Sequence, residues 1–218
     1  MAKQTQRSQA HGDAKSALAV VDSVLSYMSD SRGKPARKER ALYAAAIVFA
    51  YGVWENFVEQ LAIELAGDIA QKIAPDKVPE IVRTSLQKCT AWELNVSPGW
   101  RQLWIQKVTR QAIGDDGENY GLNTAKAGQV QDLLRWAGAE GIFGDLDQDI
   151  VPAHIANQVS SPSEALNRLV ELRGEIVHTG AVPDELRKQH VREWRQFVER
   201  LADELDESCR DHREKLLK

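Results

Sequence analysis

The stretch ALYAAAIVFAYGVWENFVEQLA, from Ala41 to Ala62, decides the fold of this chain. Its first part, through Trp54, is apolar on nearly every side of a helix, and Glu55 and Asn56 follow at once. The run falls short of the roughly 20 apolar residues that a membrane-spanning helix needs, and a helix that is apolar all round is normally buried. We therefore predict a long central core helix over about residues 36–73 and no membrane span.

The rest of the chain also has the apolar spacing of helices, and no segment alternates as a strand does. Further helices are expected over about 13–30, 81–94, 98–112, 123–141 and 161–180, with a last one that follows 181 and reaches into a charged tail. Their expected N-caps are Asp76, Ser97 followed by Pro98, Asn123 or Thr124, and Ser161 or Ser163. The sequence therefore predicts an all-α fold.

The composition narrows the classes of function. A net charge of −4 argues against broad, non-specific nucleic-acid binding as the main role. The basic run from Ser31 to Arg40 is either a local anion site or solvated surface. Cys89 and Cys209 are far apart and show neither a disulfide framework nor metal-ligand spacing, as expected of reduced thiols in a cytoplasmic protein. We therefore expect no metal and no other cofactor.

A second stretch, RLVELRGEIVHTG from Arg168 to Gly180, carries candidate chemistry. Helical spacing places Arg173 on or beside an apolar stripe formed by Leu166, Leu169, Val170 and Val177. A charged arginine there is costly unless it is paired or faces a cleft or a second subunit. His178 lies about 140° round the helix from Arg173, so the two side chains do not share one face.

The end of this helix is the second unusual feature. His178 lies in the last turn, where the helix dipole favours an imidazolium, and Gly180 is placed to end the helix. Gly174 costs about 1 kcal/mol relative to alanine in a helix interior, which a close approach of a backbone or a ligand would explain. The alternative is that Arg173 pairs with Glu171 or Glu175, and that His178 only caps the helix.

Three ordered stretches resemble one known family. LVELRGEIVHTG resembles the arginine-x4-histidine signature of the HEPN superfamily. ALYAAAIVFAYGVWENFVEQLA resembles its long central helix, with an aromatic–Glu–x–aromatic step at Trp54, Glu55 and Phe57. LNTAKAGQVQDLLRWAGAEGIF resembles the middle helix of the RiboL-PSP-type branch. The likeness extends from about Arg40 to Leu205, and it implies an all-α HEPN-type bundle, often a two-fold dimer.

The resemblance also assigns residues. It implies that Arg173 and His178 form the catalytic pair of a metal-independent endoribonuclease, with Glu55 and Gly174 as accessory positions. Glu55 is either an accessory acid that orients Arg173 or a member of a structural ion pair. The family commonly has asparagine after the arginine, so Gly174 is a departure that bears on catalytic competence. We expect attack by the RNA 2′-hydroxyl to give a 2′,3′-cyclic phosphate.

The expected organisation is an N-terminal helix and basic linker at 1–35, a HEPN-like domain at 36–205 and a charged tail at 206–218. By the resemblance, the leading function is a toxin or antiphage effector of the toxin–antitoxin or abortive-infection kind. Its expected partners are RNA, a second copy or another HEPN chain, and a controlling partner or antitoxin, with no membrane. The alternative is a non-catalytic HEPN module that binds a partner or RNA within a defence complex.

Overall fold

The computed structural model describes residues 7–29, 36–88, 90–97, 99–115, 117 and 121–218. Every regular element in these ranges is helical, which confirms the all-α prediction. The α-helices are α1 (Gln9–Ser26), α2 (Arg37–Lys72), α3 (Glu80–Ser85), α4 (Ala91–Val96), α5 (Trp100–Ile113), α6 (Ala127–Trp136), α7 (Pro162–Thr179) and α8 (Lys188–Leu217). Short 3-10 turns lie at η1 (Pro75–Lys77), η2 (Ile142–Asp145), η3 (Gln148–Ile150) and η4 (Ala153–Ile155).

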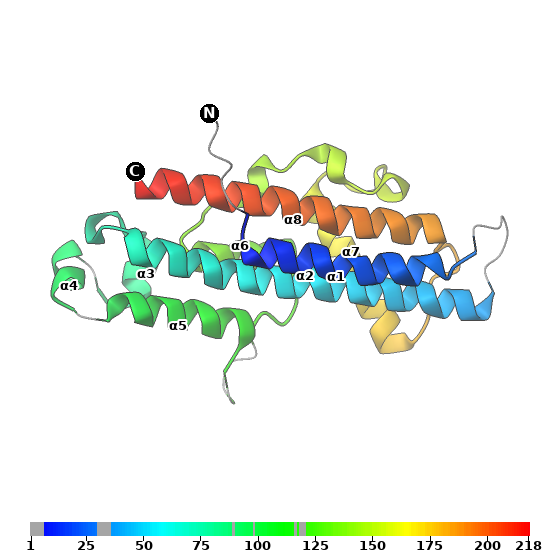
Figure 1. The fold of residues 1–218 in the computed structure, drawn as a ribbon, viewed down its shortest axis with the longest axis horizontal. Coiled ribbons are helices and arrows are strands. Elements are labelled where there is room, and N and C mark those ends of the chain that lie inside the picture. The colour runs from blue at the N-terminus through cyan, green and yellow to red at the C-terminus, as the bar shows by residue number, and fades with distance from the viewer. Residues whose placement is uncertain (1–6, 30–35, 89, 98, 116, 118–120) are drawn as a thin grey trace.

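The long helix α2 is the centre of the bundle. It contacts α1 and α8 along one side and α5, α6 and α7 elsewhere (Figure 1). Length and composition alone would allow α2 to cross a membrane, but half of its most apolar window is buried against the other helices. The buried half of this window is protein core, as the sequence predicted for this helix.

The segment between α2 and α6 differs from the prediction. The helix expected over 81–94 is two short helices, α3 and α4, and Thr90 begins the second through a capping box with Glu93. Asp76 lies within a 3-10 turn and does not cap an α-helix. The N-cap of α5 is Gly99, so Ser97 is not its cap. Pro98, Cys89 and the Ser31–Pro35 part of the basic run lie outside the described residues.

The two helices that follow are capped differently from each other. Neither Asn123 nor Thr124 caps α6; its first N–H, that of Ala127, instead donates to the side-chain oxygen of Asn167 on α7 (3.1 Å). Ser161 caps α7 as predicted, by accepting from the N–H of Glu164 (3.2 Å). The start of α6 is therefore fixed by the helix that carries the arginine and histidine.

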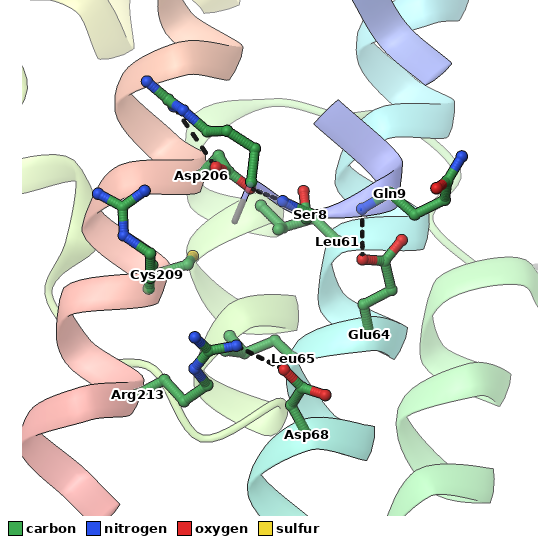
Figure 2. A pocket seen from close by; sticks show the side chains of 11 residues that line it. Ser8, Gln9, Leu61, Glu64, Leu65, Asp68, Asp206, Cys209 and Arg213 are labelled. Atoms are coloured by element: carbon green, nitrogen blue, oxygen red, sulfur yellow. Dashed lines mark hydrogen bonds and ion pairs between the residues drawn. The ribbon is translucent and has the colours of Figure 1, made fainter. Parts of the chain in front are cut away.

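The helix α1 is held between α2 and α8 by polar contacts at its start (Figure 2). The carboxylate of Asp206 on α8 is 3% exposed and accepts from the N–H of Ser8 (3.1 Å) and from Arg7 (3.4 Å). Glu64 on α2 accepts from the N–H groups of Gln9 and Ala10, which satisfies the free donors at the start of α1. The helix α8 runs to Leu217, through nearly all of the segment that was expected to be a charged tail, and Asp206 in this segment anchors α1.

Candidate active site

The first turns of α7 are packed into the core, and its last turns leave it. Leu166 and Leu169 are fully buried and Val170 is nearly so. Ile176 is the one buried residue between 173 and 180, and Val177 is 50% exposed. The prediction that Val177 completes the buried stripe is therefore wrong, because the described residues leave half of this side chain exposed. Apolar and charged side chains are exposed side by side at this end.

Arg173 is half-buried beside α2. Its guanidinium carbon lies 5.1 Å from the centre of the Tyr51 ring, a cation–π arrangement. Among the described residues it has no ion pair, and its buried Nε has no hydrogen-bond acceptor. Glu171, one of the two acids considered as its partner, pairs instead with Arg168 (2.9 Å). Arg173 is therefore a cation held against an aromatic ring, without an anion paired to it among the described residues.

Tyr51 connects Arg173 to the accessory acid. Its hydroxyl donates to Oε1 of Glu55 (2.8 Å) and accepts from the N–H of Ala125 (2.9 Å). Burial, before any other cause, raises the pKa of Tyr51 well above its ordinary value, so the hydroxyl stays protonated as this hydrogen bond requires. Glu55 forms no ion pair with Arg173 in the described structure, so any orienting effect of Glu55 passes through the Tyr51 ring.

Sequence reasoning did not select Tyr51 as a site residue. The available signal was its position four residues before Glu55 in a helix, since residues at that spacing lie on one face and can contact each other. The aromatic–Glu–x–aromatic step drew attention to Trp54 and Phe57 instead. Both of these are fully buried in the core.

His178 is exposed in the last turn of α7. The helix end is closed by other groups: Gly180 adopts a left-handed conformation (φ 67°) and its N–H donates to the carbonyl of Ile176 (3.0 Å). The hydroxyl of Thr179 donates to the carbonyl of Glu175 (2.7 Å). The imidazole makes no hydrogen bond to a described residue, so capping is not the role of this side chain here. It is free to contact a ligand.

Gly174 lies in open space. A Cβ added there would meet no atom within 4 Å. No described part of the backbone approaches this glycine, so the approach of a ligand or of a second chain stays the prediction for this position. Gly174, Val177 and His178 together form an uncovered surface at the end of α7.

Glu59 is a second carboxylate on α2, four residues beyond Glu55. Burial, and then the charge of Glu55, raise the pKa of Glu59 from 4.5 to about 7. A carboxyl group whose pKa is higher in the folded than in the unfolded state binds its proton more tightly in the folded state. The site region therefore holds a proton that is released near neutral pH.

This shift predicts a pH dependence of stability. Between pH 4.5 and about 7 the native chain binds more protons than the unfolded chain, so the free energy of unfolding should fall as the pH rises through this window. Glu59→Gln should remove that part of the fall, and its stability relative to wild type should increase with pH. Urea unfolding at pH 5, 6, 7 and 8 measures the difference. Glu80→Gln, which changes an exposed carboxylate, is the control, and parallel curves for wild type and Glu59→Gln would contradict the assignment.

Comparison with known proteins gives a family match. A family model described as RiboL-PSP-HEPN matches residues 21–211, nearly the whole chain. No curated protein and no solved structure matches the sequence. Within the described ranges, histidine, cysteine and acidic side chains form no group of three that could hold a metal ion.

Proposed function

Because the chain belongs to the RiboL-PSP-HEPN family, we propose that it is a metal-independent endoribonuclease whose active residues are Arg173 and His178. The observation that carries the proposal is the state of these two side chains. Arg173 is held against Tyr51 with no ion pair to a described residue, and five residues later the exposed imidazole of His178 makes no hydrogen bond to a described residue. A cation and an imidazole in this state suit an anionic ligand that undergoes proton transfer.

RNA provides the nucleophile for this chemistry. His178 takes the proton of the 2′-hydroxyl as a general base, and the 2′-oxygen attacks the adjacent phosphorus. Charge gathers on the non-bridging oxygens, where the guanidinium of Arg173 binds and stabilises it. The bond from phosphorus to the 5′-oxygen breaks and that oxygen gains a proton, which leaves a 2′,3′-cyclic phosphate and a 5′-hydroxyl.

The position of the two residues on α7 favours a two-fold dimer as the active form. An arginine and a histidine about 140° apart on one helix do not face the same point, but two copies of the helix end can supply both groups to one cleft. The uncovered surface of Gly174, half-exposed Val177 and His178 is available for such pairing. Glu55 contributes by fixing the Tyr51 ring under Arg173.

We place this activity in the cytoplasm, in a toxin or antiphage effector controlled by a partner. The alternative function is a non-catalytic HEPN module that binds a partner or RNA. Gly174 favours this alternative, because the asparagine common in the family would add a hydrogen-bonding side chain beside Arg173. A measurement of RNA cleavage distinguishes the ribonuclease from the non-catalytic binding module.

The test is cleavage of total RNA by purified protein in EDTA, with His178→Ala beside wild type. The expected result is cleavage by wild type alone, with 2′,3′-cyclic phosphate ends detected by enzymatic end-labelling. His212→Ala, which changes a histidine on α8, should cleave as wild type does. Absence of cleavage, or cleavage that survives His178→Ala, would overturn the ribonuclease assignment and favour the binding module.

A further inference from the structure

A groove beside the end of α7 is not used by the chemistry above. Its volume is about 510 Å³, and it lies between α7, the start of α8, the segment that joins them and the turn η4. Leu172, Ile155, Leu186 and Trp194 supply apolar surface inside it. An apolar groove of this size accommodates a side chain or a short segment of another molecule.

One wall of the groove is a fixed pair of histidines. The rings of His154 and His190 are parallel, with centres 4.4 Å apart, and the ring of Trp194 meets His154 edge-on at 5.4 Å. Glu193 holds His154 in place. Its Oε2 lies 2.6 Å from Nδ1 of His154 and accepts from the backbone N–H of His154 (2.9 Å). Burial, and then the charge of His154, lower the pKa of His190, which favours a neutral ring near neutral pH. This wall of the groove is therefore a fixed cluster of aromatic rings.

The rim of the groove is negatively charged. Glu175 and Glu185 line it, and neither carboxylate has a hydrogen bond or ion pair to a described residue. Glu171 also lines it but is paired with Arg168. Apart from the two histidines, the lining holds one arginine and three glutamates, a formal charge of −2. Such a rim repels a phosphate and attracts a cation.

The groove is close to the candidate catalytic histidine. Glu175 precedes His178 by three residues, which is a rise of about 4.5 Å along the helix and nearly the same face. A molecule bound at Glu175 therefore lies within one turn of His178. His178 does not line the groove itself, so a polypeptide seated there covers the imidazole when it extends past Glu175 toward the end of α7.

We propose that this groove binds an arginine-bearing, partly apolar segment of a partner polypeptide, which covers His178 and excludes RNA. An arginine suits both the aromatic wall and the acidic rim of the groove. Its planar guanidinium stacks on aromatic rings and forms two parallel hydrogen bonds with a carboxylate. The apolar surface accepts the neighbouring side chains of the segment. The binding stands on the groove alone, whereas the exclusion of RNA rests on the proposed function.

The test uses a blocked peptide of alternating leucine and arginine, titrated into wild type by calorimetry. We expect Glu175→Gln/Glu185→Gln to weaken binding about tenfold or more, the size of one lost charge-assisted hydrogen bond. Glu80→Gln/Glu140→Gln, which removes two exposed carboxylates elsewhere, should bind as wild type does. A leucine–glutamate peptide should not bind. Melting curves confirm that each variant is folded.

Three results would overturn the proposal: no peptide binding, equal binding by the Glu175→Gln/Glu185→Gln variant, or a short RNA whose binding to His178→Ala protein depends on these two carboxylates. The last result would make the groove a base-binding subsite. The peptide should also slow RNA cleavage by wild type in proportion to its occupancy. Because peptide binding is measured without catalysis, failure of the groove and failure of the ribonuclease assignment give different results.

Discussion

Replacing Arg173 with alanine should slow RNA cleavage by a factor on the order of a hundred to a thousand, as the loss of one positioned donor does at other charge-stabilising sites. The loss should fall mainly on kcat, because the guanidinium binds charge that increases as the 2′-oxygen attacks. Arg173→Lys should recover little, since an ammonium lacks the planar fork. Single-turnover cleavage of a defined RNA, with the product ends identified, measures the effect.

Two further variants make this result interpretable. Arg135→Ala removes an exposed arginine from the last turn of α6 and should leave the rate unchanged. Tyr51→Leu removes the ring under Arg173 and should lower the rate while Arg173 itself remains. An Arg173→Ala protein that cleaves at the wild-type rate would show that the guanidinium takes no part in the reaction.

Trp54→Ala should cost about 3–5 kcal/mol of folding stability, the usual result of truncating a fully buried tryptophan. The side chain is completely buried on α2, and its Nε1 donates to the carbonyl of Ala125 (3.0 Å). The substitution leaves a cavity and a buried carbonyl without its donor, and both effects destabilise the fold. Urea unfolding, followed by far-ultraviolet circular dichroism, measures the loss.

Trp92 is the matched control, because it is 70% exposed on α4. Trp92→Ala should change stability by no more than about 0.5 kcal/mol, as surface substitutions usually do. Similar losses in the two variants would mean that the fold does not depend on the contact between α2 and the segment that precedes α6.

The sequence predicted the long elements well and their starting points less well. The bounds of α2 lie close to prediction because a long apolar pattern has few alternatives. The break between α3 and α4 was missed, since apolar spacing continues across it while the capping box at Thr90 begins a new helix. The start of α6 could not be found locally, because its donor is satisfied by Asn167, forty residues away in the sequence.

In the candidate site, too, the residues marked by a local motif were predicted and the contacts made by the fold were not. Arg173, His178 and Glu55 were selected because family motifs mark them, and their catalytic roles remain predictions. The contact between Arg173 and Tyr51 depends on how α7 crosses α2, which no local pattern specifies. The stacking of His154 on His190 could not be predicted for the same reason, because the two residues lie in separate elements that only the fold brings together.

The contacts that hold the start of α1 against α2 and α8 have a consequence for the order in which the protein folds during synthesis. Ser8 and Asp206 are 198 positions apart, and α1 packs against both α2 and α8. The ribosome therefore synthesises α7, with Arg173 and His178, before it synthesises α8, which forms part of the surface that α1 packs against. Pairing of such distant segments is slow, so the growing chain carries its candidate catalytic residues in an unfinished bundle. The bundle is therefore complete only after α8 has left the ribosome. At that moment the protein is still close to messenger and ribosomal RNA.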